Sequence, residues 1–492
     1  MPVVLLLEGG RLGNSLLVGA VVIVCFGLWD DLRTLGWKAK FLGQTIAAAL
    51  VVGWGGLRIF SLGSLLPSGI YLPEWVAVSL AMLAIIGVTN AINLSDGLDG
   101  LAGGTSFITF VTLGLIGITG ADFPERDFLI LLCCTAAGAI QGFLRFNTFP
   151  ASVFMGDTGS QLLGFLLITL ALAMTQRETP LSPLSVLLVL GFPVLDTFSV
   201  MAERIASGRN PFTPDNNHFH HKLIRLGFYQ TEAVAAIYAL TAALSAAAFF
   251  LRYHSDWLIL VVWGGVSVLV VVFFIAADRW GFRFDRKGVF DFEVRGWPGA
   301  LKEKRIAIRT SFWILRWGLP TCFCAAALLP EEVPRWGGWA ALAALGGGSL
   351  VRLFRPQWFP ATLRGSFFIS VPFVLTQAMS SPAVGLDPRV GRCFEGAFVV
   401  LAIAIVLTLR LTRRKKGYRT SPTDFLILLV ALILPNIPDP IIAGVKLGSL
   451  AVQMIVFFYG YEVAVGEMQG RISRFAIGIT ASFVVLAIRG LL

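Results

Sequence analysis

Long apolar segments recur along almost the whole chain, and this feature limits its fold more than any other. Of the 492 residues, 56% are hydrophobic and only 14% are charged, whereas roughly a quarter of the residues in soluble domains are charged. The apolar runs approach the length of about 20 residues that a helix needs to cross a bilayer. The chain is therefore predicted to be an all-α, polytopic integral membrane protein.

About 16 membrane-spanning helices are predicted from these runs, and they fall into two sets. The first set has about nine members, at residues 13–29, 41–57, 74–92, 103–119, 128–146, 160–175, 183–203, 232–252 and 257–277. The second has about seven, at residues 311–329, 336–354, 365–379, 394–411, 424–435, 441–466 and 475–490. A polar segment rich in Arg, Lys, Asp and Glu separates them. We therefore predict a membrane module over residues 1–277, a basic cytoplasmic linker over 278–310 and a second membrane module over 311–492.

Basic residues indicate which way the helices point. One set of loops is rich in cations, beginning with Arg33, Lys38 and Lys40 after the first span. The intervening loops carry single cations such as Arg58 and Arg126. The positive-inside rule places the first set of loops in the cytoplasm. The net charge of +10 is then explained by loops that face anionic lipid, and no nucleic-acid partner is expected.

Four polar clusters follow apolar runs, and this topology places all four on the cytoplasmic face. Their members are Asp30 and Asp31; Asn90, Asn93, Asp96 and Asp99; Asn147 and Asp157; and Arg204, Arg209, His218, His220 and His221. Oxygen ligands and imidazoles gathered at one membrane surface suggest metal-assisted phosphate chemistry on a lipid.

The acid pair Asp30-Asp31 ends an apolar helix, where a carboxylate meets the negative end of the helix dipole. Such an unfavourable placement favours a cation site or a general base, and a solvated stop signal is the alternative. Lys38 and Lys40 follow closely, and a lysine can hold a phosphate as a point charge. An ordinary inside-positive lysine is the other interpretation of each.

The Asn90–Asp99 segment repeats a polar residue every three positions, which places the four side chains along one stripe of a helix. Polar groups are costly near a bilayer and usually functional when present, with a polar capping segment as the alternative. Asp157 lies between glycines just before another apolar run. A hard carboxylate there suits Mg²⁺, although it could instead cap the helix.

Three of the four histidines fall within residues 218–221. Imidazoles beside arginines suit binding of a pyrophosphate. Zinc is the competing interpretation, but no cysteine lies nearby and the spacing is tight.

The four clusters, taken in order, resemble the motifs of the polyprenyl-phosphate N-acetylhexosamine-1-phosphate transferases. The resemblance covers about residues 13–277 and leaves out residues 311–492. It is carried by Asp30-Asp31 with Lys40-Phe-Leu-Gly-Gln44, Asn90-Ala-Ile-Asn93-Leu-Ser-Asp96-Gly-Leu-Asp99-Gly-Leu, Phe154-Met-Gly-Asp157-Thr-Gly-Ser and Pro211-Phe-Thr-Pro-Asp215-Asn-Asn-His218-Phe-His220-His221.

The resemblance implies that residues 1–277 form a transferase of the EC 2.7.8 type. Such an enzyme transfers N-acetylhexosamine 1-phosphate from a UDP-sugar to undecaprenyl phosphate, releases UMP and starts a lipid-linked cell-envelope glycan such as O-antigen. It implies Mg²⁺ as cofactor, with Mn²⁺ as an alternative, and a site on the cytoplasmic side of the bacterial inner membrane. The partners it implies are a UDP-N-acetylhexosamine, undecaprenyl phosphate and membrane lipid, and it leaves a homodimer open.

Residue roles follow from the same resemblance. Asp157 is the expected Mg²⁺ ligand, with Asp96 and Asp99 as further metal candidates. Asp30 or Asp31 would orient or deprotonate the lipid phosphate or sit near the metal. Lys40 would bind phosphate. The expected catalytic residues are therefore Asp30, Asp31, Asp157 and Lys40. The expected substrate-binding residues are Asn90, Asn93, Asp96, Asp99, Asn147, Arg204, Arg209, His218, His220 and His221.

The histidine loop bears on the choice of donor. Its His218-x-His220-His221 spacing is closer to the branch that uses GlcNAc 1-phosphate, because the muramoyl-pentapeptide branch tends to show three consecutive histidines. The resemblance therefore favours UDP-GlcNAc or a related UDP-N-acetylhexosamine. The alternative from another class is a secondary transporter or a non-catalytic scaffold. Transporters place their sites near the bilayer midplane, but the acids here end helices; for residues 311–492 both alternatives stay open.

The N-terminus departs from the family pattern. Members usually carry two further helices before the span that ends in the acid pair, whereas about a dozen residues precede it here. Our hypothesis is that Met1 is a misassigned or truncated start and that the native product is longer by two helices.

Overall fold

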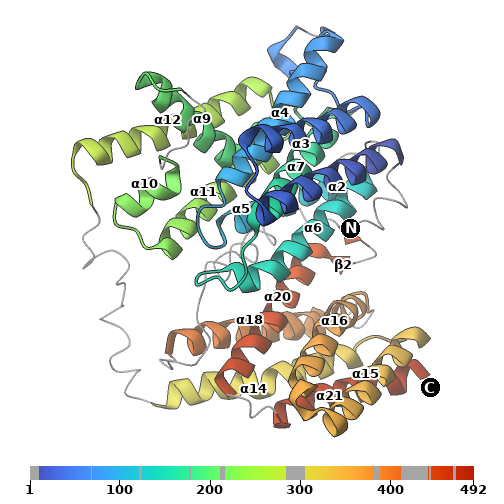
Figure 1. Cartoon of the computed structure of the whole chain (residues 1–492). Helices are drawn as coiled ribbons and strands as arrows, with labels where there is room; N and C mark the ends of the chain where they lie inside the picture. Colours follow the sequence, from blue (N-terminus) through green and yellow to red (C-terminus); the bar gives the residue numbers. More distant parts are fainter. Residues whose placement is uncertain are drawn as a thin grey trace. The chain divides into compact units, whose positions relative to one another are not determined.

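The computed structural model describes residues 10–67, 69–120, 123, 125–176, 179–210, 217–283, 305–381, 388–411, 441–442, 445–468 and 473–491, which are mostly helical (Figure 1). The described residues contain eleven helices that are long and apolar enough to cross a membrane, which confirms an all-α, polytopic membrane protein. Two short strands in the described residues, β1 (Ile441–Ile442) and β2 (Val445–Lys446), form an antiparallel pair. The predicted span 424–435, most of the predicted linker and the N-terminal residue Met1 lie outside the described residues.

Two predicted spans are interrupted in the structure. The apolar run 41–57 becomes α3 (Trp37–Ala49) followed by the π-helical segment η1 (Leu50–Trp54). The run 183–203 divides into α8 (Ser185–Val189) and α9 (Gly191–Ala206). Hydropathy alone shows neither change, because apolar residues lie directly on both sides of each.

The described helices belong to two compact units, one containing α2 to α12 and the other α14 to α21. The remaining helices of the first unit are α2 (Gly10–Leu32), α4 (Glu74–Leu94), α5 (Leu101–Thr119), α6 (Arg126–Asn147), α7 (Gly156–Thr175), α10 (Phe219–Arg225), α11 (Gln230–Leu251) and α12 (Asp256–Arg279), with a 3₁₀ turn η2 (Gly63–Leu65).

Helix α7 lies at the centre of the first unit. It packs against α2, α4 and α5, and 83% of the residues in its apolar 18-residue stretch are buried inside the protein. By contrast, only 6% of the residues in the apolar 18-residue stretch of α12 are buried. A helix that is apolar all round but exposed on most sides is suited to contact lipid, so α12 forms part of the outer wall of this unit.

Glycines bring two helices close to α7. A Cβ atom added to Gly27 of α2 would lie 2.6 Å from the Cα atom of Thr158, and one added to Gly164 of α7 would lie 2.7 Å from the Cα atom of Thr89 in α4. Small residues allow such close helix contacts in membranes. The Gly27 contact brings the C-terminal end of α2, with its acid pair, against the first turn of α7.

The second unit has its own core. It is built from α14 (Arg305–Leu328), α15 (Arg335–Phe354), the 3₁₀ turn η3 (Pro356–Trp358), α16 (Phe359–Met379), α18 (Pro388–Leu411), α20 (Leu447–Met468) and α21 (Ser473–Leu491). The rings of Phe323 and Phe367 meet edge to face with centroids 4.9 Å apart, within an apolar cluster to which α14, α16, α18, α20 and α21 contribute. An ion pair joins Arg364 of α16 to Glu462 of α20 at 2.7 Å.

We predict that Gly164→Ala destabilises the first unit. The added methyl group meets the backbone of Thr89, and overpacking of this kind costs about 1–3 kcal/mol. Thermal unfolding of the detergent-purified protein should show a lower midpoint. Gly87→Ala in α4 is the matched control, because an added Cβ atom there meets nothing within 4 Å. Equal midpoints for the two variants would contradict the close packing of α4 on α7.

Candidate active site

Lys40 joins two of the predicted catalytic acids. Its Nζ atom lies 2.6 Å from Oδ2 of Asp30 and 2.5 Å from Oδ2 of Asp157. Asp30 lies on α2, Lys40 on α3 and Asp157 on α7. The other oxygen of Asp30 accepts the backbone N–H of Leu35 at 2.6 Å, in the turn between α2 and α3. The structure therefore brings Asp30, Lys40 and Asp157 together as the sequence predicts.

Asp31 is held by the N-terminal turn of α7. Its Oδ1 atom accepts the N–H of Asp157 at 2.8 Å, and its Oδ2 atom accepts the N–H of Thr158 at 3.1 Å and the Thr158 hydroxyl at 2.6 Å. Gly156 begins α7 with φ of +65°, and a Cβ atom added there would lie 2.7 Å from Oδ2 of Asp31. Although Asp31 ends its own helix, its charge lies at the positive end of another, where it is stabilised.

Two buried glutamines support Asp157, and the sequence reasoning missed both. Gln161 donates to Oδ2 of Asp157 at 3.4 Å, and Gln44 donates to Gln161 at 3.1 Å. Gln44 lies four residues after Lys40, just as Gln161 lies four residues after Asp157. Residues four apart share a helix face, so this matched spacing of two long polar side chains in apolar helices was the available signal.

Asp96 faces the carboxylates of the other motifs. Burial, followed by the negative charges of Asp157 and Asp99, raises the pKa of Asp96 to about 6. Next to it, Asn93 donates to the Ser160 hydroxyl of α7 at 2.9 Å. In the part of the chain that the structure describes, no group of three His, Cys, Asp or Glu side chains is arranged to hold a metal ion. The carboxylates thus gather negative charge without forming a complete metal cage.

Asn147 and Asp99 fix the loop that leads to α7. Asn147 is 2% exposed, accepts the N–H of Gly100 at 3.1 Å and donates to the carbonyl of Val153 at 3.0 Å. Asp99 accepts the N–H of Ala151 at 2.9 Å. Both residues were predicted to bind substrate, and Asp99 also to bind metal. In this structure their polar atoms hold the backbone that positions Asp157.

His220 packs directly on the acidic segment after α4. A Cβ atom added to Gly97 would lie 2.3 Å from Nε2 of His220. The imidazole is 2% exposed, and neither ring nitrogen has a hydrogen-bond partner among the residues that the structure describes. Burial, followed by the charge of neighbouring His221, lowers the pKa of His220 to about 4. His220 is therefore neutral at pH 7, with one N–H donor and one acceptor nitrogen.

His218 is held by an acid that the sequence reasoning did not select. Its Nδ1 atom lies 2.9 Å from Oδ2 of Asp196 in α9, and Oδ1 of Asp196 accepts the N–H of Phe219 at 2.8 Å. Asp196 is 1% exposed. A carboxylate in the apolar first half of α9 was the signal that could have identified it, because such a residue is usually functional.

Three other predicted residues come from α4 and the end of α9. Asn90 is exposed on α4, Arg204 lies in the last turn of α9, and the N–H of Arg209, just beyond that helix, donates to the carbonyl of Arg204. The part of the histidine motif at residues 211–216 lies outside the described residues.

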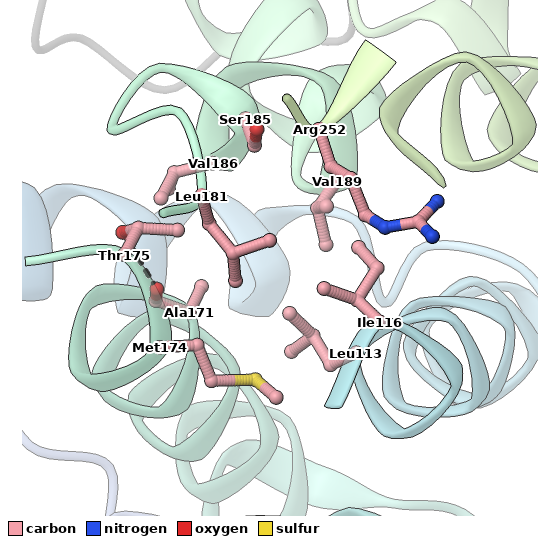
Figure 2. Close-up of a pocket in the computed structure, with 10 residues that line it drawn as sticks. All are labelled: Leu113, Ile116, Ala171, Met174, Thr175, Leu181, Ser185, Val186, Val189 and Arg252. Atoms are coloured by element: carbon pink, nitrogen blue, oxygen red, sulfur yellow. Dashed lines mark hydrogen bonds between the residues drawn. The ribbon is translucent and has the colours of Figure 1, made fainter. Parts of the chain in front are cut away.

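Two of the cavities among the described residues of this unit differ greatly in size. Figure 2 shows the smaller one, of about 10 Å³, which has room for at most about one water molecule and is lined by Leu113, Ile116, Ala171, Met174, Thr175, Leu181, Ser185, Val186, Val189 and Arg252. The larger cavity, of about 830 Å³, is lined by α9, α10 and α12 and includes Lys222, which directly follows His221. Its volume falls within the usual range of ligand pockets, so of these two cavities only the larger has room for part of a substrate.

The comparisons with known proteins agree with this assembly of motifs. The model of glycosyl transferase family 4 matches residues 14–175. A Bacillus subtilis protein named "Probable undecaprenyl-phosphate N-acetylglucosaminyl 1-phosphate transferase" is 33% identical over 269 residues, which are 54% of this chain and 73% of the relative. The Escherichia coli K12 "Undecaprenyl-phosphate alpha-N-acetylglucosaminyl 1-phosphate transferase" is 33% identical over 147 residues, which are 28% of this chain and 40% of that relative. On the strength of the long Bacillus match and the family model, the chain belongs to glycosyl transferase family 4.

Proposed function

We propose that this protein transfers an N-acetylhexosamine 1-phosphate, namely GlcNAc 1-phosphate, from UDP-GlcNAc to undecaprenyl phosphate and releases UMP. The names of the relatives supply the acceptor lipid and the sugar. The observation that carries the proposal is the contact of Lys40 with both Asp30 and Asp157 beside Asp96. We place the site on the cytoplasmic face of a bacterial inner membrane, because the polar clusters lie on the same side of the membrane as the cation-rich loops.

The reaction joins two anions, and the site must offset their repulsion. An oxygen of the lipid phosphate attacks the phosphorus that carries the sugar. A new P–O bond forms there, the pyrophosphate P–O bond to UMP breaks, and UMP leaves with the bonding electrons. Such transfers depend on in-line positioning and on neutralising charge. Lys40 supplies a cation at the junction of three helices, and its two carboxylate partners hold the ammonium group in place.

The acidic residues fit a bound Mg²⁺. Mg²⁺ uses few protein carboxylates and keeps ligand positions for water and substrate phosphates, which agrees with a site that has no complete cage among the described residues. Asp157 and Asp96 would hold the ion, with Asp99 close by. When bound, Mg²⁺ neutralises and orients the pyrophosphate. A cation also favours the ionised form of Asp96, whose pKa is raised to about 6 in its absence.

The histidine loop would bind the donor. His220 is buried against Gly97 and has no partner for either ring nitrogen in the described part of the chain. A neutral imidazole offers a donor and an acceptor, which suits sugar hydroxyls and phosphate oxygens. The loop would therefore bring the sugar end of UDP-GlcNAc to the carboxylates.

The first test is UMP release. Purified protein given UDP-GlcNAc, undecaprenyl phosphate and Mg²⁺ should release UMP. Asp157→Asn should lower kcat by at least about 10²–10³-fold, because the Mg²⁺ that would offset the transition-state charge loses a ligand. Asp127→Asn is the matched control, since Asp127 is an exposed carboxylate in the first turn of α6. Near-normal turnover by Asp157→Asn, with the control also active, would remove Asp157 from the mechanism.

The second test asks whether Asp31 acts as a cap of α7 or takes part in the chemistry. Because Asp31 accepts three hydrogen bonds from the start of α7, Asp31→Ala should lower stability by about 0.5–2 kcal/mol, the usual cost of losing a helix cap. Asp31→Asn keeps an acceptor oxygen and should retain most of the thermal stability and part of the activity. Unfolding midpoints and UMP release of both variants give the answer. If Asp31→Asn unfolds like the wild type but is as inactive as Asp31→Ala, the charge of Asp31 acts in the chemistry and not as a cap.

The third test concerns the donor. In a panel of UDP-sugars, we expect kcat/KM to be highest for UDP-GlcNAc or another free UDP-N-acetylhexosamine and much lower for UDP-MurNAc-pentapeptide. The expectation comes from the spacing of His218, His220 and His221. Efficient use of the pentapeptide donor would place the enzyme in the peptidoglycan branch.

A further inference from the structure

Asp196 is a buried carboxylate that has no part in the mechanism proposed above. It lies on α9 with 1% of its surface exposed, beside the buried apolar side chains of Phe192 and Leu195. Removing a charged carboxylate from water is costly unless its oxygens are paired. Its two partners therefore indicate what the residue does.

Both oxygens of Asp196 are directed at the start of the histidine loop. Oδ1 accepts the N–H of Phe219, the first residue of α10, and Oδ2 lies 2.9 Å from Nδ1 of His218. The first N–H groups of a helix have no partner within the helix, so Asp196 satisfies one of them. Because a carboxylate only accepts hydrogen bonds, Nδ1 of His218 carries a proton, and in the neutral ring Nε2 is then the acceptor.

The contacts continue from His218 to the acidic segment. The rings of His218 and His220 are stacked, with centroids 5.9 Å apart and planes 6° apart. His220 in turn lies against Gly97, between Asp96 and Asp99. An ordered series of contacts thus runs from a carboxylate on α9 through two imidazoles to the proposed metal and pyrophosphate region.

We infer that Asp196 is a positioning residue for the donor: it fixes the orientation and tautomer of His218, and through the stacked rings it holds His220 where UDP-GlcNAc binds. The inference rests on the proposed function for the identity of the donor. A carboxylate that orients a functional imidazole is a recurrent arrangement, and losing it typically costs about 10–100-fold in affinity or activity.

Donor binding without turnover is the decisive measurement. Titration of UDP-GlcNAc into the detergent-purified full chain in the presence of Mg²⁺ should give a Kd about 100-fold higher for Asp196→Ala and about tenfold higher for Asp196→Asn. Asparagine can still accept the Phe219 N–H, but its amide group disfavours the native tautomer of His218. Thr197→Val is the matched control, because it removes the neighbouring hydroxyl, whose oxygen is buried and unbonded among the described residues, and should change Kd by less than about twofold.

Two further readouts distinguish positioning from general stability. The affinity for undecaprenyl phosphate should stay within about twofold of the wild-type value in Asp196→Asn. In the His218→Ala background, Asp196→Ala should raise the Kd for UDP-GlcNAc by less than about threefold, because the residue acts through that ring. If Asp196→Ala does not fold, Asp196→Asn alone and combined with His218→Ala gives the same comparison.

The inference is overturned by an unchanged donor Kd in a folded Asp196→Asn, by additive effects with His218→Ala, or by equal losses of donor and lipid affinity. It is also overturned if the wild-type protein does not bind UDP-GlcNAc. A wild-type protein that binds UDP-GlcNAc in an Asp196-dependent manner but releases no UMP would support the inference and reject the proposed function.

Discussion

The carboxylate of Asp31 meets the N-terminal turn of α7, and the geometry of the site follows from this contact. The first turn of a helix presents N–H groups without partners, and here two of them are taken by a side chain from α2. The contact is close because Gly27 and Gly156 leave room for the neighbouring chain. Asp157 lies in that turn, so the helix that fills the centre of the unit also carries the acid around which the predicted motifs gather.

Compensation of charge explains most of the other contacts. Asp30, Asp31, Asp96, Asp99 and Asp157 lie near one another, and like charges at short range oppose ionisation. Burial, followed by the charges of Asp157 and Asp99, raises the pKa of Asp96. Four of the five have partners: Lys40 serves Asp30 and Asp157, while backbone N–H groups serve Asp31 and Asp99. Asp96 feels the charges of Asp157, Asp99 and Asp31, which supports our proposal that it would help to hold Mg²⁺.

The fold class could be predicted from the apolar runs, and the grouping of the motifs from the ordered polar clusters. The contacts that each polar residue makes within the site could not. Asn147 and Asp99 have the side chains expected of ligands, yet the structure uses them to hold backbone, and residue type alone cannot separate these uses. Asp196 was missed because its partners lie 22 and 23 residues away. The π-helical segment after α3 and the break between α8 and α9 were missed because apolar residues lie on both sides of each.

The matched spacing on α3 and α7 also fixes how the two helices align. Lys40 pairs with Asp157, and one turn further along Gln44 pairs with Gln161. A slip of one turn, about 5.4 Å, would place Gln44 opposite Asp157 and leave Lys40 with Asp30 as its acid partner. Asp157 would then lose its cation while other carboxylates lie nearby, and like charges at short range oppose ionisation. The two pairs therefore favour one alignment of α3 with α7. A substitution in one member of a pair is then best accommodated by a complementary substitution on the other helix.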